Sequence, residues 1–378
     1  MTLLDWHHRR TDRVANYEFA ASMRWAFRQA CIGAGVCLAV DSPIAGTSFR
    51  TPEVTNVELG TPLRMTVRML EGTVPAALAR AGHLIAPHLG GVALRVADRG
   101  FGWAVVTVLT SDPLAGSLEL PPSPRAGVLL GRDEGGENLE VDPVELPHLI
   151  VQGQTRSGKS TWLYALIVQL LRHLNVVVAG VDPSGITLRP FTGTAHARWQ
   201  ASGLADPHAL EAVLVALVAD MDARLAAMPL DRDILPISAE HPLVVTILDE
   251  YPALLRALDA ADPKQGKRVR ALVARLLAES HKVGHRMVIA AQRAEASIVG
   301  AAERAQCGGR LSFRVDSADS VKLLHSDAEL LAGGHTSARP GIALCSWPGR
   351  PLTRIRGPYL GGYGAYAAAV TAATRGAA

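Results

Sequence analysis

The first part of the chain shows short periodic patterns of apolar and polar residues. Tyr17–Gln29 has the spacing of an amphipathic helix, and Leu63–Leu70 alternates apolar and polar residues as a half-buried strand does. Pro75–Ala86 predicts a second helix, because proline is well tolerated at the first helical position. Two further strands are expected at Val92–Ala97 and Trp103–Leu109. Together these elements predict a small α/β domain.

A longer run of alternating strands and helices follows the proline-rich stretch Leu120–Arg125. A hairpin over Gly127–Val141 precedes an apolar strand at His148–Gln152, and the alternation continues to about Ile355. Such alternation is typical of a mostly parallel sheet covered by helices on both faces. We therefore expect an α/β fold in four segments: an N-terminal helical segment at 1–48, the small α/β domain at 49–125, a larger parallel-sheet domain at 126–360, and a flexible Gly/Ala-rich tail at 361–378.

The composition is that of a folded chain with a sizeable core. Apolar residues make up 48% of the 378 residues and charged residues 19%, which excludes bulk disorder. The net charge of +3 permits a nucleic-acid partner without requiring one. The four cysteines lack metal-ligand spacing and are interpreted as reduced thiols of a cytoplasmic protein. The apolar run Ala30–Val40 is about half of the ~20 residues that cross a bilayer, so no membrane span is expected.

Gly153–Ser160 reads Gly-Gln-Thr-Arg-Ser-Gly-Lys-Ser and fits the phosphate-binding motif G-x-x-x-x-G-K-S/T without a mismatch. The strand before it and the helical run Thr161–Leu174 after it are the setting that the motif needs, because loop N–H groups and a helix N-terminus then surround phosphate. Lys159 is expected to reach the β- and γ-phosphates of ATP, and the Ser160 hydroxyl to bind Mg²⁺. A Gly-rich turn that matches by chance is the alternative, and the flanking elements argue against it. The predicted nucleotide-binding residues are Gly153, Gln154, Thr155, Arg156, Ser157, Gly158, Lys159, Ser160 and Thr161.

The run Leu243–Glu250 has the pattern of a buried central strand that ends in two acids. Asp249 is expected to hold Mg²⁺ and Glu250 to orient and polarise the attacking water, so both are predicted catalytic residues together with Lys159. The alternative is a buried strand followed by a helix cap with solvated carboxylates, which the phosphate-binding motif disfavours. A third strand, Met287–Gln292, ends in a polar residue. Gln292 is expected to sense the γ-phosphate between the other two strand tips.

With these motifs in place, the chain resembles the motor domain of the FtsK/SpoIIIE family of double-stranded-DNA translocases, including the FtsK-like conjugation motors of actinobacterial plasmids (TraB type). The resemblance covers about Gly127 to Ile355, over half of the chain. The matching segments are Leu146–Gly153 (family MPHLLVAG), Val181–Gly185 (IDPKG), Met221–Leu225 (MERRY), Ile247–Glu250 (VIDE), and Ile289–Arg293 with Gly309–Val315 (LATQRP and ARIAFRV).

The chain also departs from the family pattern. Arg156 stands where the family usually has glycine, Ser184 where it has lysine, and Ala294 where it has proline. The segment Ser280–Gly284 replaces the family's GRAAG. These departures leave ATP binding intact and indicate a divergent branch that serves a mobile element.

The resemblance implies a RecA-like P-loop NTPase fold and a ring, usually a hexamer, that threads duplex DNA. Motors of this class complete each site with an arginine from the neighbouring subunit, because the developing phosphoryl charge needs a further cation. Arg310 is the first candidate for this catalytic role, and Arg304 and Arg314 come next. The alternative for Arg310 is a surface or salt-bridging arginine.

A run of basic residues follows the predicted Asp249–Glu250 strand. Charge runs are usually solvated faces, but in this fold the loops after the strand tips face the pore of the ring. Lys and Arg contacts to phosphate are expected there, and they are independent of sequence. The residues of the run are Lys264, Lys267, Arg268, Arg270, Arg275, His281, Lys282, His285 and Arg286.

Three functions remain in competition at this point. The first is an ATP-dependent double-stranded-DNA translocase that serves conjugal transfer or another mobile-element process. The second is an FtsK-like ATPase that moves proteins, as type VII secretion ATPases do, although those usually carry several P-loop domains in tandem. The third is an ATP-gated coupling or scaffold protein, which the intact Asp249–Glu250 pair disfavours. The expected partners are duplex DNA, further copies of the chain and a membrane-bound protein, which would place a cytoplasmic chain peripherally at the membrane.

Overall fold

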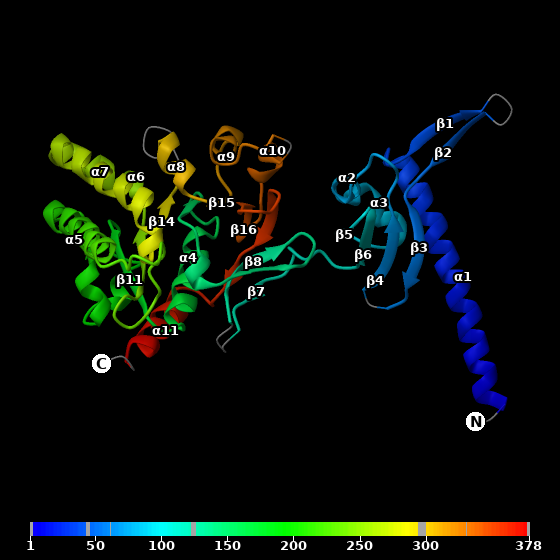
Figure 1. Ribbon diagram of the computed structural model, residues 1–378, viewed down its shortest axis with the longest axis horizontal. Helices are drawn as coiled ribbons and strands as arrows, with labels where there is room; N and C mark the ends of the chain where they lie inside the picture. Colours follow the sequence, from blue (N-terminus) through cyan, green and yellow to red (C-terminus); the bar gives the residue numbers. More distant parts are fainter. Residues whose placement is uncertain are drawn as a thin grey trace. The chain divides into compact units, whose positions relative to one another are not determined.

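The structure is a computed structural model that describes residues 3–42, 46–60, 62–121, 126–293, 300–329 and 331–375. Most of the predicted proline-rich joint and the departure at Ala294 lie outside the described residues. The chain forms two compact units, residues 1–116 with 134–137 and residues 117–133 with 138–378 (Figure 1). No helix in the described ranges has the length and hydropathy required to cross a bilayer.

The first unit is a helix packed on a small antiparallel sheet. Helix α1 (Leu3–Gly33) is followed by the hairpin of β1 (Leu38–Ser42) and β2 (Gly46–Arg50). The sheet has the order β3-β4-β6-β5. Its strands are β3 (Glu53–Glu58), β4 (Leu63–Arg68), β5 (Ala93–Gly100) and β6 (Trp103–Leu109), and its short helices are α2 (Pro75–Arg80), α3 (Gly82–Ile85) and η1 (Ala86–Leu89).

The core of this unit contains residues from two segments that were predicted to be separate, 1–48 and 49–125. Phe27 and Cys31 of α1 are buried in one apolar cluster with Met65 and Val106 of the sheet. The helical segment 1–48 and the α/β region after it therefore pack as one unit. The predicted helix Pro75–Ala86 is divided into short pieces, because its course turns at Ala81 and Gly82.

The second unit contains a ten-stranded sheet with the order β12-β11-β13-β14-β10-β15-β16-β17-β8-β9. The strands from β12 to β15 pair in parallel, and those from β15 to β9 are antiparallel. The parallel strands are β10 (Leu149–Gln152), β11 (Val176–Asp182), β12 (Gln200–Ser202), β13 (Leu243–Leu248), β14 (His285–Ala291) and β15 (Gly309–Phe313). The others are β8 (Val128–Asp133), β9 (Asn138–Val141), β16 (Ile342–Ser346) and β17 (Thr353–Arg356).

Helices cover both faces of this sheet, as the alternation along the chain predicts. On β13, Val244 and Leu248 belong to one apolar cluster and Val245 and Ile247 to the other, so successive side chains serve opposite faces. The first face packs against α5 (Pro207–Ala226), α6 (Tyr251–Ala261) and α7 (Pro263–Glu279), and the second against α4 (Lys159–Leu171) and α11 (Tyr363–Arg375). The remaining helices are η2 (Pro143–Glu145), η3 (Arg189–Phe191), η4 (Ala195–Trp199), η5 (His281–Val283), α8 (Ala301–Gln306), α9 (Ala318–Leu324) and α10 (Ala332–His335).

Two of the predicted boundaries need correction. The flexible tail predicted at 361–378 is wrong for the described residues to 375, because Tyr363, Tyr366 and Val370 form an apolar stripe along α11 and the last two are fully buried. The second unit begins at residue 117 rather than 126. The reason is that β7 (Leu118–Glu119) pairs with β18 (Pro358–Tyr359) of the same unit.

Candidate nucleotide site

The loop between β10 and α4 has the geometry of a phosphate cradle. Gly158 has a φ of 104°, and a β-carbon there would lie 2.6 Å from the backbone nitrogen of Gly341. A β-carbon on Gly153 would lie 2.5 Å from Oγ of Ser157. Glycine is therefore required at both positions, and α4 begins immediately after the loop at Lys159. The loop N–H groups and the N-terminus of this helix are the donors that bind phosphate.

Glu250 connects the three predicted strand tips. Lys159 Nζ forms an ion pair with Glu250 Oε2 at 3.0 Å, and the backbone N–H of Gln292 donates to Glu250 Oε1 at 3.2 Å. Strand β14 lies between β13 and β10 in the sheet, so Gln292 follows the strand that separates the two motifs. Glu250 itself has a left-handed φ of 49°, which aims its side chain from the start of α6.

Asp249 is half-buried beside this pair. The hydroxyl of Thr187 donates to Asp249 Oδ2 at 2.6 Å. Desolvation is the largest influence and raises the pKa of Asp249 above its ordinary value; the hydrogen bond from Thr187 and the charge of Lys159 oppose this rise, and the neighbouring carboxylates of Asp182 and Glu250 add to it. A divalent cation bound at this carboxylate would favour its ionised form, which is the form that ligates such a cation.

Thr187 belongs to a turn that the motifs did not single out. The buried carboxylate of Asp182 accepts the backbone N–H groups of Ser184, Gly185 and Leu188 at 2.9, 3.0 and 3.1 Å. This network shapes the turn and delivers Thr187 to Asp249. The Asp-Pro-Ser-Gly sequence signals a turn, but nothing in the sequence indicates which carboxylate the following threonine reaches.

The C-terminal helix supports the same turn from outside. The Tyr366 hydroxyl donates to the backbone carbonyl of Thr187 at 2.6 Å, and the Tyr363 hydroxyl to that of Ile186 at 3.1 Å. The Tyr366 ring stacks on Tyr164 of α4 with centroids 4.3 Å apart. Helix α11 thus holds the Thr187 turn against the helix that follows the phosphate-binding loop.

We expect Thr187→Val to lower the ATPase rate about tenfold at neutral pH, because the half-buried Asp249 carboxylate loses a charge-assisted hydrogen bond. Since that bond lowers the pKa of Asp249, its loss raises the pKa. The acid limb of the pH–rate profile should therefore move to higher pH. Rates measured across pH for this variant and for Thr192→Val, an exposed threonine of the same loop, test this. Identical profiles for Thr187→Val and the parent would contradict it.

Known proteins show sequence similarity to the part of the chain that contains this site. Residues 121–234 match the family model of the FtsK/SpoIIIE family. A DNA translocase FtsK from Treponema pallidum is 29% identical over 251 residues, which cover 62% of this chain and 30% of that protein. Another from Leptospira interrogans is 26% identical over 273 residues, which cover 67% of this chain and 27% of that protein. The chain is similar to the FtsK/SpoIIIE family over the segment that holds the phosphate-binding loop and the Thr187 turn. It spans less than a third of the length of these two curated relatives.

Solved structures share the fold of this chain. The conjugation coupling protein TcpA of pCW3, in its monomer form with ATPγS, matches with a TM-score of 0.57 and 16% identity, covering 90% of this chain and 95% of that chain. The cytoplasmic domain of the type VII secretion ATPase EccC from Thermomonospora curvata matches with a TM-score of 0.51 and 20% identity, covering 69% of this chain and 33% of that chain. Together with the family-model match, these fold matches identify the second unit as a RecA-like P-loop ATPase domain.

The departures from the FtsK/SpoIIIE pattern have local explanations. Arg156 has a left-handed φ of 63°, the conformation for which the family's glycine is suited, and its side chain is exposed. A non-glycine residue in this backbone conformation carries a strain energy of ~1–3 kcal/mol. The Ser184 hydroxyl donates to Asp182 Oδ1 at 2.7 Å, so the replacement for the family's lysine closes the turn that holds Thr187.

The structure gives Arg310, the predicted catalytic arginine, contacts within its own chain. Its guanidinium donates to three backbone carbonyls of its own chain, those of Cys307, Leu324 and Arg304, at 3.2, 3.1 and 2.8 Å. Reaching a neighbouring subunit would leave those carbonyls without this donor. Arg310 also pairs with Ile150 at the end of the parallel strands away from the phosphate-binding loop. Arg310 therefore anchors α8 and α9 to β15.

Arg314 lies on the opposite end of β15, beside the phosphate-binding loop. Its backbone carbonyl accepts the N–H of Gln154 at 2.9 Å. Its side-chain Nε is buried and makes no hydrogen bond within the described part of the chain. Of the three arginines considered, Arg314 is the one whose position next to the loop suits a phosphate contact.

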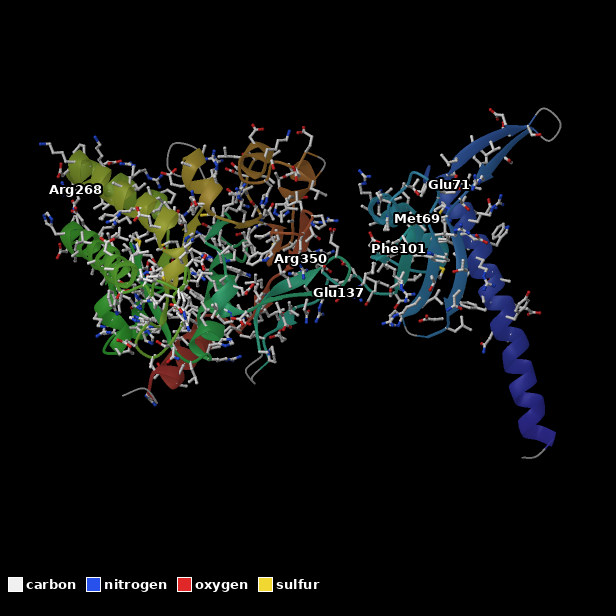
Figure 2. All side chains as sticks on the ribbon, viewed as in Figure 1. Met69, Glu71, Phe101, Glu137, Arg268 and Arg350 are labelled. Atoms are coloured by element: carbon white, nitrogen blue, oxygen red, sulfur yellow. The ribbon has the colours of Figure 1, made fainter. Side chains whose placement is uncertain are left out.

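The basic run after the Asp249–Glu250 strand is largely neutralised, which corrects its interpretation as a DNA grip. Acids of α5 and α6 face α7, so Arg268 pairs with Glu211 at 2.6 Å, Arg270 with Asp259, and Arg275 with Asp222 at 2.6 Å. Figure 2 labels Arg268 on α7. His285 and Arg286 are buried in the core. In the described ranges the lysines of α7, Lys264 and Lys267, are the exposed cations of this helix without such a pair.

Proposed function

We propose that this chain is an ATP-driven motor that moves double-stranded DNA as a ring of identical copies, in the transfer of a mobile element. The observation that carries the proposal is the meeting of Lys159, Asp249 and Glu250 at the strand tips of an FtsK/SpoIIIE-type domain. A cation for phosphate, an acid that can hold Mg²⁺ and a general base are the parts that nucleotide hydrolysis requires.

The Lys159–Glu250 ion pair suggests how binding prepares hydrolysis. The γ-phosphate competes with Glu250 for the Lys159 ammonium, and a lysine that turns to phosphate releases the carboxylate to orient and deprotonate water. Ser160 in the first turn of α4 and Asp249 are the residues that would hold Mg²⁺, which neutralises phosphate charge when bound. One hydroxyl and one carboxylate suit this ion, which takes its other ligands from water and phosphate. Arg314 replaces Arg310 as the candidate for a further cation.

Two comparisons support DNA as the substrate and transfer as the setting. The curated FtsK relatives are named DNA translocases, and the fold match to the conjugation coupling protein TcpA extends over most of both chains. We infer duplex DNA and further copies of the chain, as a hexamer, as partners, together with a membrane-bound protein that keeps a cytoplasmic motor at the membrane. The fold match to EccC supports a protein-moving ATPase as the second candidate.

The ATPase rate of the full chain in the presence of duplex DNA separates these candidates. A motor that moves DNA should hydrolyse ATP at least several-fold faster with saturating duplex DNA than without it, because the polymer engages the ring and commits each site to turnover. A rate that is unchanged by DNA would contradict the proposal and favour the protein-moving alternative. An ATP-gated scaffold would show little hydrolysis under either condition.

A further inference from the structure

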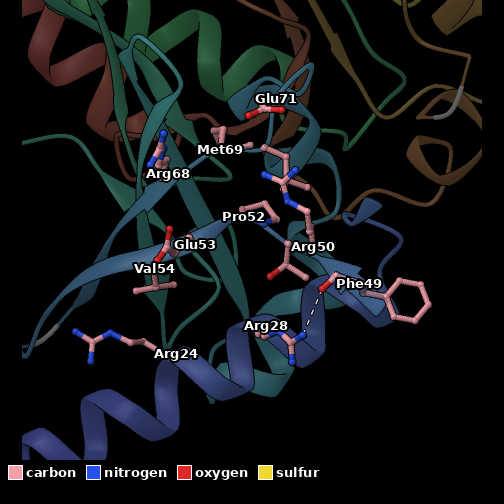
Figure 3. Close-up of a pocket in the computed structure, with 12 residues that line it drawn as sticks. Arg24, Arg28, Phe49, Arg50, Pro52, Glu53, Val54, Arg68, Met69 and Glu71 are labelled. Atoms are coloured by element: carbon pink, nitrogen blue, oxygen red, sulfur yellow. Dashed lines mark hydrogen bonds between the residues drawn. The ribbon is translucent and has the colours of Figure 1, made fainter. Parts of the chain in front are cut away.

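The first unit contains a hollow of about 510 Å³ that the nucleotide chemistry does not use (Figure 3). Four arginines from three different elements line it. Arg24 and Arg28 come from α1, Arg50 ends β2, and Arg68 ends β4. The close-up shows α1 below the other lining residues, with Arg28 beside the backbone carbonyl of Phe49 and Arg24 extending to the left above the helix.

Packing of the unit explains why these side chains gather. Phe27 and Cys31 bury one side of α1 in the core, which leaves Arg24 and Arg28 one helical turn apart on the side that lines the hollow. Arg28 Nη2 donates to the backbone carbonyl of Phe49 at 3.3 Å and so connects the helix to the β1–β2 hairpin. The arrangement is therefore held by the fold.

The hollow has an excess of positive charge. Glu53 and Glu71 also line it, so four guanidinium groups face two carboxylates. Throughout the described ranges, none of the four arginines has a carboxylate oxygen within 4.0 Å, whereas the arginines of α7 have close acidic partners. Each guanidinium offers five N–H donors in a planar fork, and most of these donors remain for a ligand. An anion with several separated oxygens matches this lining.

We propose that the hollow lined by Arg24, Arg28, Arg50 and Arg68 binds the phosphate backbone of the DNA that the motor moves. The inference rests on the proposed function. Arginine forks suit phosphate oxygens in a bidentate arrangement, and contacts of this kind are independent of base sequence, as a translocating motor requires. The concave shape fits a ridge such as a sugar–phosphate strand, whereas a membrane surface would be met by a flat or convex basic face.

The hollow offers arginines without acidic partners, whereas the arginines of α7 in the second unit have such partners. There the arginines predicted to hold DNA are paired with acids of the same chain. The α7 arginines could bind phosphate only if those ion pairs were broken. The arginines of the hollow could bind phosphate without breaking an ion pair. The first unit thereby gains a direct part in DNA binding.

The test is the salt dependence of duplex-DNA binding by the full chain. Affinity for a labelled duplex is measured at several KCl concentrations for the parent and for a variant with Arg24, Arg28, Arg50 and Arg68 all changed to glutamine. Each lost phosphate contact lowers the slope of log affinity against log salt by about 0.9, so the slope should fall by up to ~3.6. Affinity at low salt should drop at least ~10-fold. Arg99→Gln, an exposed arginine of the same sheet outside the hollow, should keep the parental slope.

Thermal unfolding of the variants confirms that they fold. A folded quadruple variant with the parental slope would overturn the inference while leaving the proposed function standing. A parent that binds no duplex DNA would overturn the proposed function and the inference with it. Loss of binding to vesicles containing phosphatidylserine, with DNA binding unchanged, would also overturn the inference and assign the hollow to a membrane surface.

Discussion

Lys159→Ala is expected to weaken ATP binding at least ~100-fold. Lys159 begins α4 directly after the phosphate-binding loop, and its ammonium is the cation that the loop presents to phosphate. Charge-assisted hydrogen bonds contribute ~1.5–3 kcal/mol each, so losing contacts to two phosphates removes enough free energy for this change. Titration of the full chain with a fluorescent ATP analogue measures the effect.

The fold of this variant should survive. Lys159 pairs with Glu250, whose side chain is 22% exposed, so water can replace the ammonium when it is removed. Thermal unfolding should therefore change little. Lys267→Ala on α7 is the matched control, since this exposed lysine lies outside the site, and it should bind ATP as the parent does. Parental affinity in Lys159→Ala would show that Gly153–Ser160 is not the nucleotide site.

The sequence predicts those parts of the structure that depend on local patterns. The phosphate-binding loop requires glycines at fixed spacing between a strand and a helix. Gly153 and Gly158 therefore predict the loop together with the strand before it and the helix after it. The apolar run before Asp249 is fully buried in the sheet, as its composition indicates. Strand β14 lies between the two motif strands, which brings the backbone N–H of Gln292 to Glu250, while the expected contact of the Gln292 side chain with the γ-phosphate stays a prediction.

Features that depend on distant partners could not be predicted in this way. The basic residues of α7 give no sign that Glu211 and Asp222 of α5 will face them, because those acids lie more than 50 residues earlier in the chain. Arg310 likewise has the composition of a surface or catalytic arginine, and only the folded chain places three backbone carbonyls around its guanidinium. Tertiary contacts decide what such charges do.

The contacts of Thr187 and of the C-terminal helix also could not be predicted from the sequence, because they too depend on distant partners. A threonine six residues after Val181 is ordinary in sequence, yet its hydroxyl donates to the Asp249 carboxylate. The Gly/Ala-rich tail contains an apolar stripe of tyrosines and a valine. The helix that carries this stripe is stable because the stripe packs against α4.

Glu250→Gln is expected to bind ATP but to hydrolyse it at least ~100-fold more slowly. Glutamine has nearly the same shape and keeps an oxygen for the Gln292 N–H, but it cannot accept a proton from water. The Lys159 ammonium also loses its competing carboxylate, so ATP affinity should be retained or increased. Single-turnover hydrolysis and nucleotide titration separate the two effects. Glu240→Gln, an exposed glutamate outside the site, should turn over at the parental rate. Normal hydrolysis in Glu250→Gln would mean that another residue activates the water.

The central claim is that hydrolysis at this site moves duplex DNA. Displacement of the third strand from a triplex at one end of a long duplex measures such movement directly. The full chain should displace the strand with ATP and fail to do so without it, and Glu250→Gln should bind both DNA and ATP yet displace nothing. Displacement that persists in Glu250→Gln, or brisk DNA-stimulated hydrolysis by the parent with no displacement, would contradict the account.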